Sequence, residues 1–258
     1  MSVAAFVHVQ GRRIEYRRFD PAQAVPGSTT IILLHEGLGS AGMWKDFPQQ
    51  LAQATGASVV AYSRLGYGQS DPRPETEDPL QMHEQEALLV LPLFLRELEI
   101  TQPVLFGHSD GASIALVYAG AAALQPAGLV VLAPHVFVED MCIANIAAAK
   151  HTFLTTDMSQ RLSRYHSDAN NAFWLWNNLW LAPSFKAWNI EHYLPSIRCP
   201  VLAIQGYEDE YGTMEQLERL SKGTQQPKLL KLHACGHFPH RDQPRAVLDA
   251  TKAFIDAL

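Results

Sequence analysis

Short apolar runs alternate with longer amphipathic segments along most of this chain. Phe6–Val9 and Ile14–Arg17 flank Gln10-Gly11 and predict an opening antiparallel hairpin. Further apolar runs predict buried strands at residues 30–34, 58–62, 104–106, 128–132, 201–204 and 228–232. Apolar residues three or four positions apart predict helices at residues 44–55, 84–97, 112–119, 216–221 and 245–258. This alternation predicts a mostly parallel, eight-stranded sheet with helices on both faces.

The alternation stops between Pro134 and Pro195. The next sheet strand is delayed by about sixty residues, far beyond the usual connection between elements. We therefore expect residues 134–195 to form a helical cap, inserted after the sixth strand. The core would then consist of residues 1–133 and 196–258.

Aromatic residues gather in this expected cap, which holds four of the five tryptophans. Helical spacing puts Trp176 and Trp180 near one face, with Phe173, and Trp174 on another. Aromatic residues on two faces indicate that one set packs the cap while another roofs a pocket. The alternative interpretation is that all of them attach the cap to the body.

A Gly-x-Ser-x-Gly pentapeptide, residues 107–111, joins a predicted strand to a predicted helix. In that setting Ser109 is held on a sharp turn with its hydroxyl exposed, and the backbone N–H of Asp110 is free to bind an oxyanion. A side chain at Gly107 or Gly111 would collide with the neighbouring strand or helix. We expect the Asp110 side chain to cap the helix that follows.

A serine alcohol becomes an effective nucleophile when a histidine takes its proton and a carboxylate orients that histidine. After an elbow of this type the acid comes next in the chain and the histidine last. Asp209 follows the strand at 201–204, and His237 follows the strand at 228–232. Both would lie with Ser109 at the carboxyl edge of one sheet. The neighbouring alternatives are Glu208 and Glu210 for the acid, and His233 and His240 for the base.

Charge, hydropathy and cysteine spacing limit which partners, location and metal sites the sequence supports. The net charge of −6 gives no basic footprint for nucleic acid or an anionic membrane. No apolar run approaches the roughly 20 residues of a membrane span. Residues 1–6 lack the layout of a signal peptide, which predicts a cytoplasmic location. Cys142, Cys199 and Cys235 lack metal-ligand spacing, which indicates reduced thiols.

The motifs together resemble the α/β-hydrolase superfamily over nearly the whole chain. The matching segments are residues 35–40, 64–71, 107–111 and 206–209, and then Gly236-His237 followed by Asp242 and Pro244, in the order typical of that family. The resemblance implies an α/β-hydrolase fold in which Ser109 is the nucleophile, Asp209 the acid and His237 the general base. It also implies that the backbone N–H groups of Gly37 and Asp110 form the oxyanion hole. The sequence departs from the family at His35-Glu36, where most relatives have His-Gly.

Glu36 is the least expected residue beside this chemistry. A carboxylate close to a developing oxyanion opposes it unless a cation or hydrogen bonds hold the carboxylate away. Arg64 follows a neighbouring strand and is a candidate partner. Glu36 either forms a structural ion pair, binds loop amides, or shapes leaving-group or water binding. We expect the substrate pocket to be lined by Glu36, His108, Trp174, Trp176, Trp180 and Phe238.

The predicted activity is hydrolysis of a small, largely apolar carboxylic ester or lactone through an acyl-enzyme. It requires a small-molecule substrate and no metal or organic cofactor. The same residues also suit hydrolysis of a carbon–carbon bond in ring-cleavage products, or of an acyl thioester. The alternative from another class is a small-molecule receptor of the same fold. The sequence does not set the oligomeric state.

Overall fold

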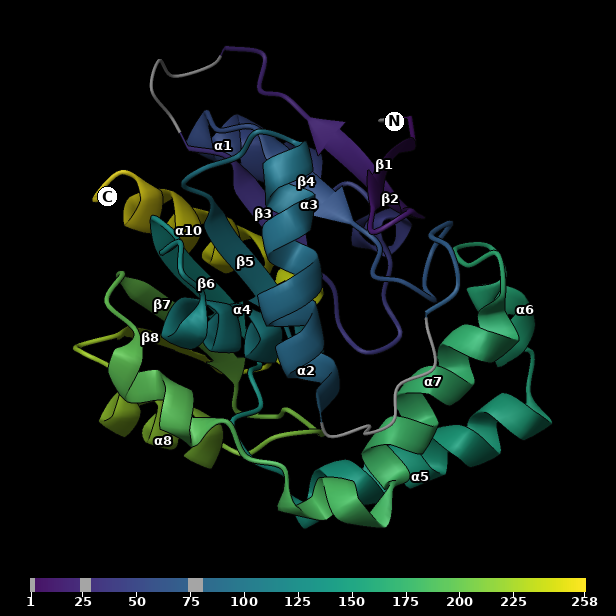
Figure 1. Cartoon of the computed structure of the whole chain (residues 1–258). Helices are drawn as coiled ribbons and strands as arrows, with labels where there is room; N and C mark the ends of the chain where they lie inside the picture. The colour runs from purple at the N-terminus through teal and green to yellow at the C-terminus, as the bar shows by residue number, and fades with distance from the viewer. Residues whose placement is uncertain (1–2, 24–28, 74–80) are drawn as a thin grey trace.

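The computed structural model describes residues 3–23, 29–73 and 81–258 (Figure 1). Met1 and Ser2 of the opening segment, and residues 24–28 and 74–80 of the expected core, lie outside the described residues. An eight-stranded sheet has the order β1-β2-β4-β3-β5-β6-β7-β8. Its strands are β1 (Ala5–Val9), β2 (Arg12–Phe19), β3 (Ile31–Leu34), β4 (Val59–Tyr62), β5 (Val104–His108), β6 (Gly128–Leu132), β7 (Val201–Gly206) and β8 (Lys228–Leu232).

The sheet is mostly parallel, as the strand and helix alternation predicts. β1 and β2 form the antiparallel opening hairpin, and β2 also pairs antiparallel with β4. The pairs from β4 through β3, β5, β6 and β7 to β8 are all parallel. Parallel strands present their carboxyl ends at one edge, so the loops after β3, β5, β6, β7 and β8 converge there.

Helices cover both faces of the sheet, and the two-residue period of the strands divides the core between them. In β3, Ile32 and Leu34 belong to the apolar core beneath α4, whereas Ile31 and Leu33 face the core that includes Phe47. The first face is covered by α3 (Leu91–Glu97), α4 (Asp110–Ala121) and α8 (Glu215–Gly223), and the second by α1 (Phe47–Thr55) and α10 (Pro244–Ile255).

Two expected helices differ from the observed ones for local reasons. The helix expected from residue 44 begins at Phe47, because Lys45 has a φ of 53° and separates α1 from a 3₁₀ turn at Ala41–Trp44. In place of the helix expected at 84–97, the chain forms α2 (Met82–Gln85), a π-helical turn at Glu86–Val90 and α3, which ends at Glu97 as expected. The N–H of Leu91 donates to Glu86 five residues earlier, and Pro92 has no N–H to donate.

Three helices lie between β6 and β7, in the segment expected to form the cap. They are α5 (Asp140–Thr155), α6 (Met158–Leu162) and α7 (Ala169–Leu181), and they lie together at the lower right of Figure 1. The Asp168 side chain caps α7 by accepting a hydrogen bond from the N–H of Asn171 at 2.8 Å. Phe153 of α5 stacks on Phe173 of α7, with ring centroids 3.8 Å apart. In the described ranges, no helix has the length and apolarity needed to cross a bilayer.

Candidate active site

Ser109 lies on a strained turn between β5 and α4. Its φ of 53° and ψ of −120° lie in a region that costs a residue with a side chain about 1–3 kcal/mol. The turn brings three backbone segments close together, because a Cβ at Gly107 would lie 2.3 Å from the Gly111 carbonyl oxygen. A Cβ at Gly111 would lie 2.0 Å from the carbonyl oxygen of Leu34 in β3. Both glycines are therefore sterically required, which confirms the expected collisions.

The structure brings Ser109, His237 and Asp209 together, although they are far apart in sequence. His237 Nε2 lies 2.9 Å from the Ser109 hydroxyl oxygen, and His237 Nδ1 lies 2.8 Å from Asp209 Oδ1. All three side chains are buried, and each follows a parallel strand at the same edge of the sheet. The imidazole can therefore exchange a proton with the hydroxyl while the carboxylate fixes its orientation.

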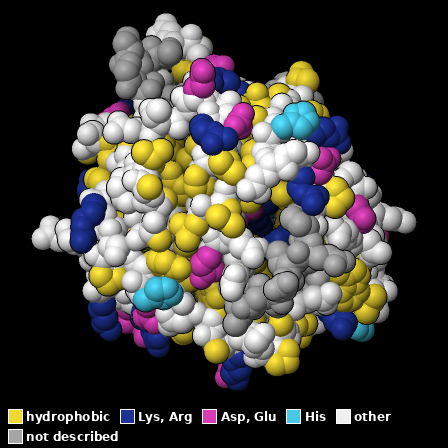
Figure 2. Space-filling model, viewed as in Figure 1, with side chains coloured by type: hydrophobic (Ala, Val, Ile, Leu, Met, Phe, Trp, Pro, Cys, Tyr) yellow, Lys and Arg dark blue, Asp and Glu magenta, His cyan; other side chains and the backbone are white. Residues whose placement is uncertain are grey.

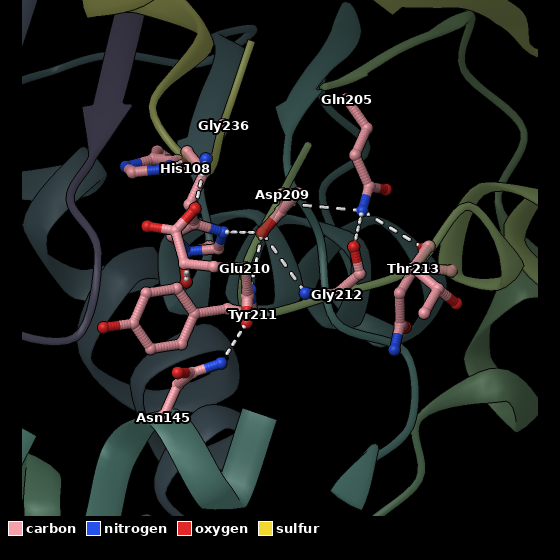
Figure 3. A network of polar contacts seen from close by, with 12 residues as sticks. His108, Asn145, Gln205, Asp209, Glu210, Tyr211, Gly212, Thr213 and Gly236 are labelled. Atoms are coloured by element: carbon pink, nitrogen blue, oxygen red, sulfur yellow. Dashed lines mark hydrogen bonds and ion pairs between the residues drawn. The ribbon is translucent and has the colours of Figure 1, made fainter. Parts of the chain in front are cut away.

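A network of hydrogen bonds fixes Asp209 (Figure 3). Its Oδ1 accepts from the N–H groups of Tyr211 at 2.8 Å and Gly212 at 3.2 Å. Its Oδ2 accepts from Gln205 Nε2 at 3.3 Å, and the same amide donates to the Gly212 carbonyl at 2.7 Å. Burial alone would raise the pKa of Asp209, but His237 and the hydrogen bonds hold this pKa below its usual range. The carboxylate is therefore charged at neutral pH.

The alternative acids and bases have other contacts. Glu208 accepts a hydrogen bond from the N–H of Cys235 at 3.0 Å. Glu210 accepts from the backbone N–H of His237 at 3.1 Å, so it positions the loop that carries the histidine. The ring centroid of His233 lies 4.3 Å from that of Tyr207, and the ring of His240 packs 4.8 Å from Trp44.

Arg64, the candidate partner of Glu36, does not pair with its carboxylate, whereas Arg241 does. The guanidinium of Arg64 donates to the backbone carbonyls of His35 and Glu36, because it reaches across from the adjacent strand to the turn itself. The Glu36 carboxylate instead lies 3.8 Å from Arg241 and 3.7 Å from His108 Nδ1. Burial alone would raise the pKa of Glu36, but His108 and Arg241 hold this pKa well below its usual range.

The two residues expected to supply oxyanion N–H groups lie on opposite sides of Ser109 in the sequence. Asp110 begins α4, and the first N–H groups of a helix have no acceptor within it. Gly37 lies beneath Trp176 of α7, and a Cβ at this glycine would lie 2.1 Å from the indole ring. Gly37 lines the cavity described below, and Asp110 directly follows Ser109, which also lines it.

The Asp110 side chain does not cap α4, contrary to expectation. Its Oδ1 accepts a hydrogen bond from Trp180 Nε1 of α7 at 3.1 Å and lies 3.3 Å from His83 Nε2 of α2. Burial alone would raise the pKa of Asp110, but the hydrogen bond and charge of His83 lower it to about 2. The carboxylate points toward Trp180 and His83 because α7 and α2 both pack over the start of α4. Asp110 therefore links the core to the expected cap.

A cavity of about 220 Å³ adjoins Ser109 and His237. Four of the residues expected in the substrate pocket line it: Glu36, Trp176, Trp180 and Phe238. Its further lining residues are Gly37, Leu38, Met43, His135, Cys142, Ile146, Ala149, Met158, Leu162, Tyr211 and Arg241. Much of the wall is therefore apolar and comes from α5, α6 and α7.

Two residues expected in the pocket are not among the described residues that line it. His108 lies behind the site, where its Nε2 is 2.7 Å from the carbonyl oxygen of His237, to which it donates. Trp174 lies two positions from Trp176, on another face of α7, where it packs edge-on against Phe153. The aromatic residues of α7 therefore divide between the cavity and the packing of α5 against α7.

His135 is a cavity residue that the sequence analysis missed. It follows β6 by three positions, at the same edge of the sheet as Ser109 and Asp209. That position was a usable signal, because ligands of parallel sheets bind at the carboxyl ends of the strands. Arg241 and Tyr211 were missed because neither belongs to a motif, and folding alone brings them to the cavity.

The described residues present no group of three or more His, Cys, Asp or Glu side chains placed to hold a metal ion. Basic and acidic side chains are interspersed over the described part of the face seen in Figure 2.

Comparison with known proteins identifies a sequence family and solved structures of similar fold. Residues 31–250 match the family described as the Alpha/beta hydrolase family. A sequence comparison with curated proteins finds no match. A similar solved structure is the proline iminopeptidase of Mycobacterium smegmatis, which is 16% identical with a TM-score of 0.79, over 99% of this chain and 98% of that one.

Two other solved structures are similar over nearly the whole length of both chains. An esterase from Exiguobacterium antarcticum is 17% identical with a TM-score of 0.75, over 98% of this chain and 100% of that one. The enol-lactonase of Burkholderia xenovorans is 17% identical with a TM-score of 0.74, with the same coverage. At these identities the similarity establishes the fold.

Proposed function

This chain belongs to the alpha/beta hydrolase family, and we propose that it hydrolyses a small, largely apolar carboxylic ester or lactone through an acyl-enzyme on Ser109. The main support is the position of His237, whose ring nitrogens lie 2.9 Å from the Ser109 hydroxyl and 2.8 Å from Asp209 beside one cavity. A buried, oriented imidazole next to a strained serine is the arrangement that nucleophilic acyl transfer requires.

In the proposed mechanism, His237 Nε2 accepts the proton of Ser109 as the hydroxyl oxygen attacks the substrate carbonyl. Asp209 accepts a hydrogen bond from His237 Nδ1, so the lone pair is kept on Nε2. The N–H groups of Gly37 and Asp110 donate to the oxyanion of the tetrahedral intermediate. His237 then protonates the leaving group, and it later activates the water that releases the acid.

The cavity supports a small substrate. Its volume of about 220 Å³ is below the usual range of pockets for drug-sized ligands. Leu162, Ile146 and Met158 contribute apolar wall, which favours an uncharged acyl group. An esterase and an enol-lactonase occur among proteins of similar structure, which agrees with an ester or lactone substrate.

The test compares purified wild-type protein with Ser109→Ala and with His237→Ala. Substrates are p-nitrophenyl esters of increasing acyl length, a lactone, a ring-fission dienoate and an acyl thioester. We expect turnover of short esters or of the lactone, and loss of almost all turnover in both variants, since triad knockouts cost on the order of a million-fold. His233→Ala is the matched control, because this histidine lies in the same loop and stacks on Tyr207.

Three results would contradict the proposal. Retention of substantial ester turnover by Ser109→Ala would exclude the serine as nucleophile. Faster cleavage of the dienoate or thioester than of any ester would reassign the substrate class. Ligand binding with wild-type turnover below about 0.1 per second on every substrate, against the usual 1–1000, would favour a receptor.

A further inference from the structure

His135 is a buried histidine whose imidazole has no hydrogen-bond partner among the described residues. The residue is 2% exposed, yet it lines the cavity that adjoins Ser109 and His237. Its Nδ1 is fully shielded from solvent, so Nε2 is the ring nitrogen that is accessible from the cavity. An unpaired buried polar group costs about 1–3 kcal/mol, so a phenylalanine or leucine would suit this wall better if packing were its only role.

The backbone around His135 is fixed by hydrogen bonds. Its carbonyl accepts from the Ser113 hydroxyl of α4 at 2.6 Å. The next N–H, that of Val136, donates to the side-chain oxygen of Gln216 at 2.8 Å. The ring itself packs edge-on against Trp180, with centroids 5.1 Å apart, and lies 5.7 Å from the ring of His237. The imidazole is thus held beside the reacting groups, as a preorganised binding residue would be.

We propose that Nε2 of His135 forms a hydrogen bond with an oxygen in the acyl part of the substrate. The preferred substrates are then esters or lactones with a hydroxyl or oxo group within a few bonds of the scissile carbonyl. This inference rests on the proposed hydrolase function and specifies its substrate class.

The position of His135 assigns the oxygen to the acyl part. The first product must leave through the open side of the cavity, while the acyl group stays on Ser109. Arg241 is on the accessible side, with 37% of its side chain exposed, whereas His135 and Cys142 are almost completely buried. The residues of the closed side therefore contact the group that remains attached.

The protonation state of His135 suits an uncharged partner. Burial lowers the pKa of His135 to about 4, so the imidazole is neutral at pH 7. A neutral imidazole has one N–H donor and one acceptor nitrogen. It can donate to an oxo group or accept from a hydroxyl, and it offers no ion pair to a carboxylate.

The test uses matched ligands that differ by one oxygen: ethyl butanoate, ethyl 2-hydroxybutanoate, ethyl 3-hydroxybutanoate and ethyl 3-oxobutanoate. kcat/KM is measured for wild type, His135→Phe and His135→Asn. Cys142→Ala is the control. Cys142 lines the same cavity, but its thiol is a much weaker hydrogen-bonding group than an imidazole. Binding of the same ligands is measured by calorimetry with Ser109→Ala and with the double variant Ser109→Ala/His135→Phe.

We expect wild type to prefer at least one oxygenated ester to ethyl butanoate by about tenfold or more, the effect of one satisfied buried hydrogen bond. His135→Phe should lose this preference, so that its ratio of kcat/KM for the oxygenated ester to kcat/KM for ethyl butanoate falls to about one, and His135→Asn should keep part of the preference. Cys142→Ala should change all rates by a similar factor.

The inference would be overturned if wild type cleaved the four esters with equal kcat/KM, or if His135→Phe kept the wild-type preference. Either result would leave the proposed hydrolase function intact. If wild type cleaves none of them, calorimetry decides the matter. Tighter binding of an oxygenated ester to Ser109→Ala than to the double variant supports the role of His135, and equal binding refutes it. Loss of folding in His135→Phe would be visible in its thermal melting curve, and the His135→Asn ratios then decide.

Discussion

At the scale of single residues, Asp110 shows how one side chain can connect the reaction site to the rest of the molecule. Its backbone lies next to Ser109, where the proposed oxyanion would bind, and its carboxylate binds Trp180 of α7. The sequence predicts a helix cap, because an acid at the start of a helix commonly serves as one. The tertiary contact prevails because the indole N–H and His83 are both buried with the carboxylate.

Trp180→Phe should lower the free energy of unfolding, because the buried Asp110 carboxylate loses the indole N–H as a donor. We expect a loss of about 1–3 kcal/mol beyond the loss caused by the smaller ring. Urea denaturation monitored by circular dichroism measures this difference. Trp188→Phe is the matched control, since the buried Nε1 of Trp188 has no hydrogen-bond partner among the described residues. Equal losses in the two variants would show that the bond to Asp110 contributes nothing.

At the scale of elements, the turn between β5 and α4 stores strain at Ser109. Because its φ is positive, Ser109→Gly should be more stable than Ser109→Ala by about 1 kcal/mol, since glycine alone adopts this region without a steric cost. The midpoints of urea unfolding of the two variants give the comparison, and neither variant has the nucleophile. An alanine variant as stable as the glycine variant would mean that the turn is not strained.

The elements themselves could largely be predicted from sequence, because buried parallel strands are short continuous apolar runs. Strand β8 was expected with its observed bounds, and β4 within one residue. Helix starts were less predictable, since the boundary of α1 depends on the positive φ of Lys45, which no periodicity encodes.

The candidate site could be predicted where chemistry is tied to a motif. Ser109, Asp209 and His237 follow strands and glycines in a recognisable order, and the structure brings them into contact. The partner of Glu36 could not be derived, because Arg241 lies about two hundred residues away and reaches it only through α9 (Pro239–Asp242). His135 was overlooked because a lone histidine after a strand carries no spacing pattern.

At the scale of the whole molecule, buried histidines make the fold sensitive to acid. Burial lowers the pKa of His135 to about 4, and it also lowers the pKa values of His35, His108, His166 and His240. In the unfolded chain these groups take up protons below about pH 6.5. Between about pH 6.5 and pH 4 the unfolded state therefore binds more protons than the folded state, which favours unfolding.

The free energy of unfolding should therefore fall as the pH is lowered from about 6.5 toward 4, with a slope of up to about 1.4 kcal/mol per pH unit for each such histidine. Urea denaturation at a series of pH values measures the slope. His135→Phe should show a smaller slope than wild type, because it removes one of these groups. A flat stability profile across this window would mean that the buried histidines are protonated in the folded protein.

The contact between Gly37 and Trp176 joins the loop after β3 to α7 and restricts how related sequences can diverge. No residue larger than glycine fits at position 37 while the indole stays where it is, since an added Cβ would lie 2.1 Å from that ring. A lineage that enlarges position 37 must first shorten position 176, because the reverse order passes through an intermediate in which the two side chains clash. The two positions should consequently covary among descendants of this sequence, and an aromatic residue placed as Trp176 is should occur only together with glycine at position 37.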